Sequence, residues 1–161
     1  MLTPDILTIE PKICLGRSLN MSLANNRVGE LWRSFMPEIG SIQNRKNKEI
    51  ISAQVYEPDY FNQFDINRTF EKWAAVEVDN HSSDIGDRFN LFEIPGGLYA
   101  VFHYKGLSTD TSIFQYIYGE YLPSSEFELD NRPHFEVLGD RYKNNDPESE
   151  EDIYIPIKRK Q

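Results

Sequence analysis

The sequence predicts an α+β protein in which a strand–helix–strand–strand unit occurs twice. Short segments in which apolar and polar residues alternate recur along the chain, which is typical of half-buried strands. Each half of the chain also contains one segment with apolar residues three and four positions apart, as in an amphipathic helix. The resulting order favours antiparallel sheets with helices on one face. No sequence repeat is visible, so the duplication is inferred from element order alone.

The first unit is predicted to begin with a strand over 13–23. Asn25 and Asn26 can cap the helix that follows, and Pro37 should end it early. The apolar stripe of this helix consists of Val28, Leu31, Trp32, Phe35, Met36 and Ile39. Strands over 49–57 and 70–79 complete the unit, and a loop rich in aromatic residues separates them.

The second unit is predicted to follow a polar loop, Asn80–Asp87, and one additional strand at the join. The sequence Ile94-Pro95-Gly96-Gly97-Leu98 suits a type II turn between two strands of a hairpin. A second helix is expected to begin near 108–110 and to end at Pro123. Its apolar side carries Ile113, Phe114, Ile117, Tyr118 and Tyr121. Strands over 131–139 and 152–158 follow.

Composition and charge restrict the function. The chain has 17 basic and 26 acidic residues, a net charge of −9, which argues against binding to nucleic acid or to an anionic membrane. Cys14 is the single cysteine, no secretion signal precedes it, and no apolar run reaches transmembrane length. We therefore expect a cytoplasmic protein.

Motifs for metal or cofactor binding are not recognised in the sequence. His81, His103 and His134 lack the spacing of metal ligands, and no glycine-rich phosphate-binding motif occurs. We expect neither a metal nor a cofactor.

Alternation also predicts which residues lie on the face that the helices leave free. We assign Tyr56, Trp73, Tyr154 and Glu136 to that face, and Ile51, Ala53 and Val55 to the helix side. One interpretation is an ordinary solvated sheet surface, since aromatic residues are common in strands. The other is an aromatic cleft with one acid, which would select bulky cations because each cation–π contact contributes about 0.5–2 kcal/mol.

Several blocks of the sequence resemble the GyrI-like domain, also called the AraC-type effector-binding domain. They are LFEIPGGLYAVFHYKG (91–106), IFQYIYGEYLP (113–123), LDNRPHFEVLG (129–139) and DIYIPI (152–157). The N-terminal half is similar to a stand-alone bacterial subgroup of that family. The resemblance implies one domain, 1–161, built from modules of approximately 1–87 and 88–161, with pseudo-twofold symmetry and a ligand cleft between the modules.

The resemblance also implies a binding site for small molecules. Glu136 matches the glutamate with which multidrug-responsive relatives bind lipophilic cations. Aromatic residues expected at the cleft are Trp32, Tyr56, Trp73, Tyr104, Phe114 and Tyr154. Trp32 and Phe114 fit the core stripes of the two helices equally well. No catalytic residue is assigned.

We therefore expect a stand-alone sensor or scavenger that binds a small aromatic or cationic xenobiotic, related to the effector domains of transcription regulators. The chain shows no DNA-binding segment, so we expect no direct contact with nucleic acid. One alternative is a hydrolase of electrophilic xenobiotics that uses Glu136, assisted by Tyr56 or Tyr104. Another is a protein-interaction role, with gyrase or a regulator as the partner.

Overall fold

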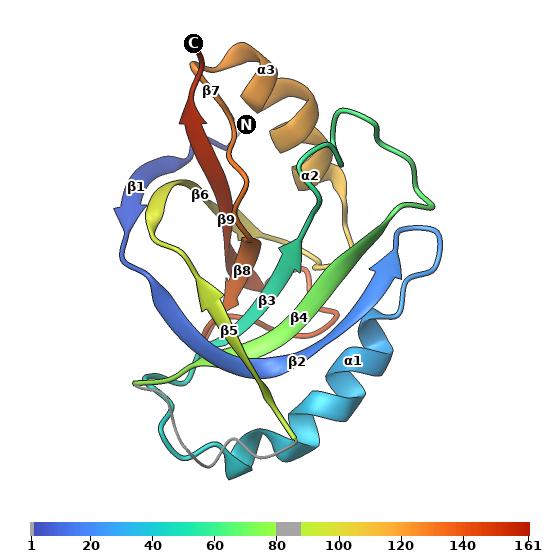
Figure 1. Cartoon of the computed structure of the whole chain (residues 1–161), viewed down its shortest axis with the longest axis vertical. Coiled ribbons are helices and arrows are strands. Elements are labelled where there is room, and N and C mark those ends of the chain that lie inside the picture. Colours follow the sequence, from blue (N-terminus) through green and yellow to red (C-terminus); the bar gives the residue numbers. More distant parts are fainter. Residues whose placement is uncertain (1, 80–87) are drawn as a thin grey trace.

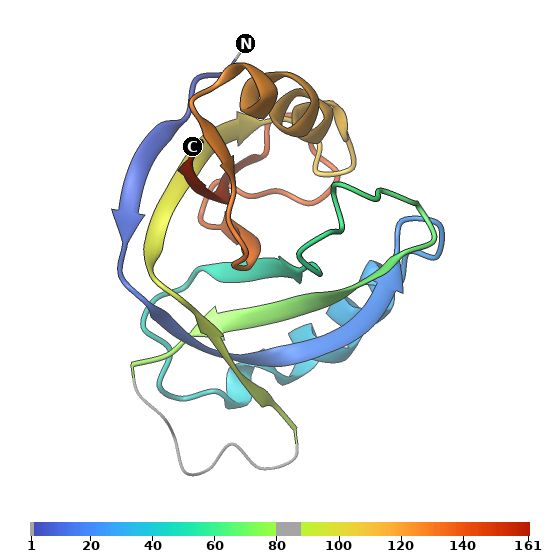
Figure 2. The same cartoon turned by 45° about the horizontal axis from the view of Figure 1, so that its top comes forward.

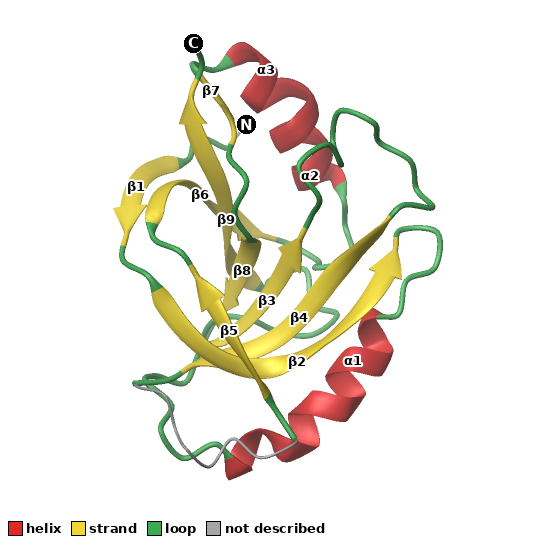
Figure 3. Cartoon of the chain, in the orientation of Figure 1, coloured by secondary structure: helices red, strands yellow, loops and turns green. Residues whose placement is uncertain are grey.

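The structure, a computed structural model, describes residues 2–79 and 88–161 (Figures 1 and 3). The predicted polar loop Asn80–Asp87, with His81, lies outside the described residues. The strands are β1 (Asp5–Ile9), β2 (Lys12–Ser22), β3 (Ile50–Val55), β4 (Thr69–Glu77), β5 (Asn90–Ile94), β6 (Gly97–Lys105), β7 (Phe127–Leu129), β8 (His134–Leu138) and β9 (Glu150–Arg159). Of these, β1 and β7 were not predicted.

The two predicted helices are present, with different internal geometry. The first is α1 (Val28–Phe35), and it continues as a 3₁₀ helix over Met36–Ser41 because Pro37 removes a backbone donor. The second consists of α2 (Ser112–Tyr116), a π-helical turn over Ile117–Tyr121 and α3 (Leu122–Ser124). No helix in the described part of the chain is long and apolar enough to cross a membrane.

The strands form one antiparallel sheet in the order β1-β6-β9-β8-β3-β4-β2-β5, with β7 paired to β9. The α+β prediction is thus confirmed. The order reads the same in reverse when β1 is exchanged with β5, β2 with β6, β3 with β8 and β4 with β9. We infer from this symmetry that the segments on either side of residues 80–87 are two equivalent modules of one domain.

The predicted hairpin between β5 and β6 is wrong. Residues on both sides of Pro95-Gly96 pair with one continuous segment, because Ile94 lies opposite Lys12 and Gly97 lies opposite Ile9. The chain bends at Pro95-Gly96 without reversing its direction. A side chain at Gly96 would meet the backbone oxygen of Ile9 at 2.6 Å, so glycine here permits close approach of the two strands.

This continuity closes the sheet. β1 runs into β2 and β5 runs into β6, so the same two segments supply both ends of the strand order (Figure 2). The closed sheet surrounds an apolar cluster drawn from strands all around it. Its buried members are Cys14, Ile51, Ala53, Trp73, Ala75, Phe92, Ile94, Tyr99, Val101, Phe135 and Val137.

The helices lie on the outside of the closed sheet. Leu31 and Phe35 of α1 pack against Leu15, Ala74 and Val76 of β2 and β4. The second helical segment packs against β6 and β9. Figure 1 shows this segment in orange, well separated from α1 in light blue. Between these two covered regions, the adjacent strands β3 and β8 form the centre of the outer face.

Candidate functional site

Glu136 lies on β8 at the centre of the outer face. Its cross-strand neighbour on β3 is Ser52, and His134 lies opposite Gln54. Gln54 Nε2 donates a hydrogen bond to Glu136 Oε1 at 3.2 Å. Glu136 is 8% exposed, and its other oxygen, Oε2, is buried without a hydrogen-bond partner among the described residues. The site therefore contains a carboxylate oxygen that is still unsatisfied.

Lys72 supplies a positive charge beside this carboxylate. It lies opposite Gln54 on β4, and its Nζ is 4.0 Å from Glu136 Oε1. The same Nζ donates a hydrogen bond to Ser52 Oγ at 2.8 Å. Burial lowers the pKa of Lys72, and the negative charge of Glu136 partly restores it. Burial raises the pKa of Glu136, which Lys72, Gln54 and Ser52 oppose.

Glu151 is a second carboxyl group at the site. It lies on β9, which pairs with β8, and its side chain faces the same side as Glu136. Burial, and then the charge of Glu136, raise the pKa of Glu151 to about 7. Two carboxyl groups thus share the single ammonium group of Lys72, and the site favours additional positive charge.

Aromatic rings of the segment that follows β3 lie beside the polar side chains of Glu136, Lys72 and Glu151. The ring of Tyr56 lies 4.9 Å from that of His134, and Tyr60 and Phe61 contact Tyr56 at 4.6 and 5.0 Å. Phe61 stacks on Tyr118 of the second helical segment at 4.6 Å. Burial raises the pKa of both Tyr56 and Tyr118, and the charge of Glu136 adds to this. The rings therefore form an apolar wall to which the segment after β3 and the second helical segment both contribute.

His134 is the polar member of that wall. It is 4% exposed, and burial lowers its pKa to about 3, so the imidazole is neutral at neutral pH. Tyr118 Oη lies 2.8 Å from His134 Nδ1. This hydrogen bond fixes the orientation of the imidazole ring against the second helical segment.

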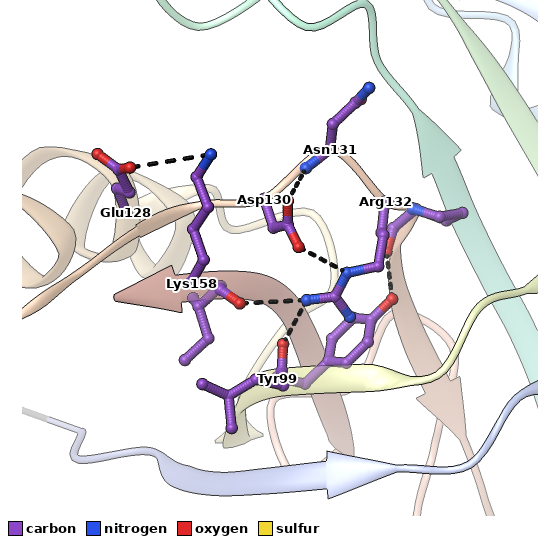
Figure 4. A network of polar contacts seen from close by, with 9 residues as sticks. Tyr99, Glu128, Asp130, Asn131, Arg132 and Lys158 are labelled. Carbon is purple, nitrogen blue, oxygen red and sulfur yellow. Dashed lines mark hydrogen bonds and ion pairs between the residues drawn. The ribbon is translucent and has the colours of Figure 1, made fainter. Parts of the chain in front are cut away.

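A polar network fixes the beginning of β8 and thereby the position of His134 and Glu136 (Figure 4). The guanidinium of Arg132 lies 4.7 Å from the ring centre of Tyr99, and its Nη2 donates to the backbone oxygens of Leu98 and Ile157. Arg132 Nε donates to Asp130 Oδ2 at 3.0 Å. Tyr99 in turn donates to the backbone oxygen of Pro133 at 3.0 Å.

A hollow of about 450 Å³ lies next to Glu151, at the end of β9. Tyr104, Arg141 and several carboxylates line it together with Glu151. No cluster of three or more potential metal ligands occurs among the described residues.

The structure brings some of the predicted site residues together. Tyr56 lies at the site with Glu136. Phe114 lies next to Tyr118, and the centres of their rings are 6.4 Å apart. Tyr104 lines the hollow beside Glu151, and its hydroxyl donates to the backbone oxygen of Leu107. Trp32 is a half-buried residue of α1 that packs against the core cluster of that helix, 6.3 Å from Phe35, and no contact joins it to Glu136 among the described residues.

The assignment of Trp73 and Tyr154 to the face of Glu136 is wrong. Trp73 stacks on Phe92 at 4.5 Å and Tyr154 stacks on Phe135 at 4.5 Å, both in the interior of the closed sheet. Ile51, Ala53 and Val55 also face this interior and not the helices. Alternation identified the two sides of each strand correctly, but the sheet buries both of its faces, so apolar character could not tell them apart.

The sequence analysis missed other groups that the structure places around Glu136. Lys72 had a recognisable signal, because it is a charge within the otherwise apolar strand segment 70–78. The aromatic loop was noted without a role. The missed residues are Tyr60, Phe61, Lys72, Tyr118 and Glu151. Alternation placed Ser52, Gln54 and His134 on the face of Glu136 without naming them as site residues.

Solved structures with the same fold have low sequence identity to this chain. SAV2435 bound to tetraphenylphosphonium matches with a TM-score of 0.71 at 17% identity, over 96% of this chain and 93% of that one. The C-terminal domain of EcmrR matches with a TM-score of 0.71 at 11% identity, over 99% of both chains. A hydrolase encoded by lin2189 from Listeria innocua matches with a TM-score of 0.61 at 10% identity, over 97% and 92%.

No curated protein sequence matches the chain. The family model described as "Cass2: Integron-associated effector binding protein" matches residues 5–157, nearly the whole length. The GyrI-like resemblance found in the sequence is confirmed by this match and by the shared fold. The chain belongs to the family of integron-associated effector-binding proteins.

Proposed function

We propose that this protein binds lipophilic aromatic cations at the outer-face site around Glu136. The observation that carries the proposal is the buried carboxylate of Glu136, which keeps one oxygen without a partner while aromatic rings surround it. SAV2435, which shares the fold, has been solved with the aromatic cation tetraphenylphosphonium.

The chemistry of the site matches such a ligand. A carboxylate surrounded by apolar groups is costly unless a positive charge compensates it. Lys72 supplies one such charge for both Glu136 and Glu151, and a ligand cation would supply the second. The rings of Tyr56, Phe61 and Tyr118 offer cation–π and stacking contacts to the aromatic part of the ligand.

Phe61 indicates how an aromatic ligand would lie. Its ring is nearly parallel to those of Tyr118 and His134, with interplanar angles of 29° and 17°. A flat ring is therefore already accommodated against these two residues. Ligand binding requires the segment that carries Tyr60 and Phe61 to move aside, and the ligand then replaces the stacking contacts that Phe61 loses.

The role that follows is that of a sensor or scavenger of cationic xenobiotics in the cytoplasm. Hydrolysis of an electrophile and contact with gyrase or a regulator remain the competing functions. Turnover of a bound electrophile that disappears in Glu136→Gln, while binding persists, would favour the hydrolase.

Calorimetric titration with tetraphenylphosphonium tests the proposal, with triphenylphosphine oxide as an uncharged aromatic control. We expect saturable binding of the cation that weakens at least about tenfold in Glu136→Gln, with little change for the neutral compound. Glu77→Gln is the matched control, because Glu77 is also 8% exposed and pairs with Lys12 and Lys46 away from the site. Equal losses in the two variants, or equal losses for both compounds, would overturn the proposal.

A further inference from the structure

The two oxygens of the Glu136 carboxylate have different surroundings. Oε1 accepts a hydrogen bond from Gln54 and lies 4.0 Å from Lys72 Nζ. Oε2 is buried and has no hydrogen-bond partner among the described residues. A buried acceptor without a donor is unfavourable, so this oxygen favours a ligand that brings a donor hydrogen.

Lys72 affects how strongly the Glu136 carboxylate attracts a ligand cation. Its ammonium group already compensates part of the charge of Glu136, and it is held there by its hydrogen bond to Ser52. Lys72 repels a second positive charge, and the carboxyl group of Glu151 offsets this repulsion, so the site still attracts any cation. Charge therefore does not distinguish one cation from another, whereas a directed hydrogen bond does.

We infer that the ligand of this site is an aromatic cation whose positively charged group carries an N–H, such as a protonated ring nitrogen or amine, and that Glu136 Oε2 accepts its hydrogen bond. This inference rests on the proposed function and narrows its ligand class. Quaternary ammonium and phosphonium cations lack such a hydrogen, so they leave Oε2 buried and unsatisfied. Lys72 lowers the affinity of both kinds of cation by a similar factor, so the hydrogen bond to Oε2 decides between them.

A matched pair of dyes tests this inference. Acridine orange is protonated at its ring nitrogen at neutral pH, and its derivative methylated at that nitrogen is a permanent cation without an N–H. A charge-assisted hydrogen bond predicts that the protonated dye binds the wild-type protein about tenfold more tightly or better. In Lys72→Met we expect both dyes to bind more tightly by a similar factor, with their ratio unchanged.

The double variant Lys72→Met/Glu136→Met provides the control for the size of the methyl group. It removes the carboxylate and its counter-charge together, which avoids an unpaired buried charge and keeps the variant able to fold. Any remaining preference for the protonated dye in this variant measures the steric effect of methylation. We expect the ratio of the two affinities to fall close to one.

The outcomes separate the inference from the proposed function. If the methylated dye binds the wild-type protein as tightly as acridine orange, or if the preference is as large in the double variant, the inference is wrong while cation binding stands. If neither dye nor tetraphenylphosphonium binds, the proposed function fails and the inference fails with it. A preference that is present in the wild-type protein and absent from the double variant supports both.

Discussion

The interior of the closed sheet and the outer-face site are both buried and both rich in aromatic rings, yet they differ in polarity. In the interior, Trp73 stacks on Phe92 and Phe135 stacks on Tyr154. The buried Tyr99 hydroxyl there donates a hydrogen bond to the backbone oxygen of Pro133, so this hydroxyl has a partner. At the outer site, similar rings adjoin an ion pair and the unsatisfied oxygen of Glu136.

This difference separates a structural core from a candidate binding site. The stacked rings of the interior offer a ligand no charged acceptor, whereas the buried oxygen of Glu136 without a donor does. Substitutions in the two regions should therefore have opposite effects on stability and on cation binding. Changes in the interior should affect stability and leave cation binding intact, while changes at the outer site should affect binding, charge and pH dependence.

The largest effect is expected in the interior. Phe135 is fully buried between Tyr99 and Tyr154, so Phe135→Ala leaves a cavity and should lower the free energy of unfolding by about 4 kcal/mol. Urea unfolding measures this loss. The folded fraction should bind tetraphenylphosphonium with unchanged affinity. A large loss of affinity with little loss of stability would contradict the division between the two regions.

The next effect concerns the ion pair of the outer site. Lys72→Met leaves the buried charge of Glu136 without its counter-charge, which should destabilise the protein by about 3 kcal/mol. Adding Glu136→Met should restore most of that loss, because an apolar pair of similar volume replaces the buried ion pair. Urea unfolding of the three variants, including Glu136→Met alone, forms a double-mutant cycle. Additive losses would show that the two residues are not energetically coupled.

A smaller effect is expected from His134 at acidic pH. Its pKa is about 3 in the folded protein and about 6.5 in the unfolded chain, so the unfolded state binds more protons below neutral pH. Stability should therefore fall as the pH falls, by about 2 kcal/mol from this residue between pH 7 and pH 5. His134→Gln should lose less stability than the wild-type protein by that amount across the same interval. An identical pH dependence of the two proteins would show that the imidazole is not held neutral.

The smallest effect is a pH dependence of cation binding. Because the pKa of Glu151 is about 7, a cation bound nearby should favour its ionised form and release a proton. Affinity for tetraphenylphosphonium should then rise a few-fold between pH 6 and pH 8. Glu151→Gln should flatten this rise, which titration at several pH values can measure. An affinity that falls with pH would contradict this assignment.

The sequence predicted the helices and most strands, because periodicity and capping residues act locally. The role of Glu136 was implied by the family resemblance and stays a prediction. The sequence did not predict that β5 leads into β6 across Pro95-Gly96 without a reversal, since the same residues are favourable in a type II turn and at a bend between two strands. It misplaced Trp73 and Tyr154, because closure of the sheet buries both of its faces. It missed the contact between Lys72 and Glu136, which depends on the register of β3 with both β4 and β8.

The most direct test of cation binding at the outer face is a crystal structure of the protein with bound acridine orange. The dye is expected beside Glu136, with its ring nitrogen within hydrogen-bond distance of Oε2 and the ring of Phe61 displaced from Tyr118. Density for the dye in the hollow beside Arg141, or in the interior next to Trp73, with Phe61 unmoved, would contradict the account.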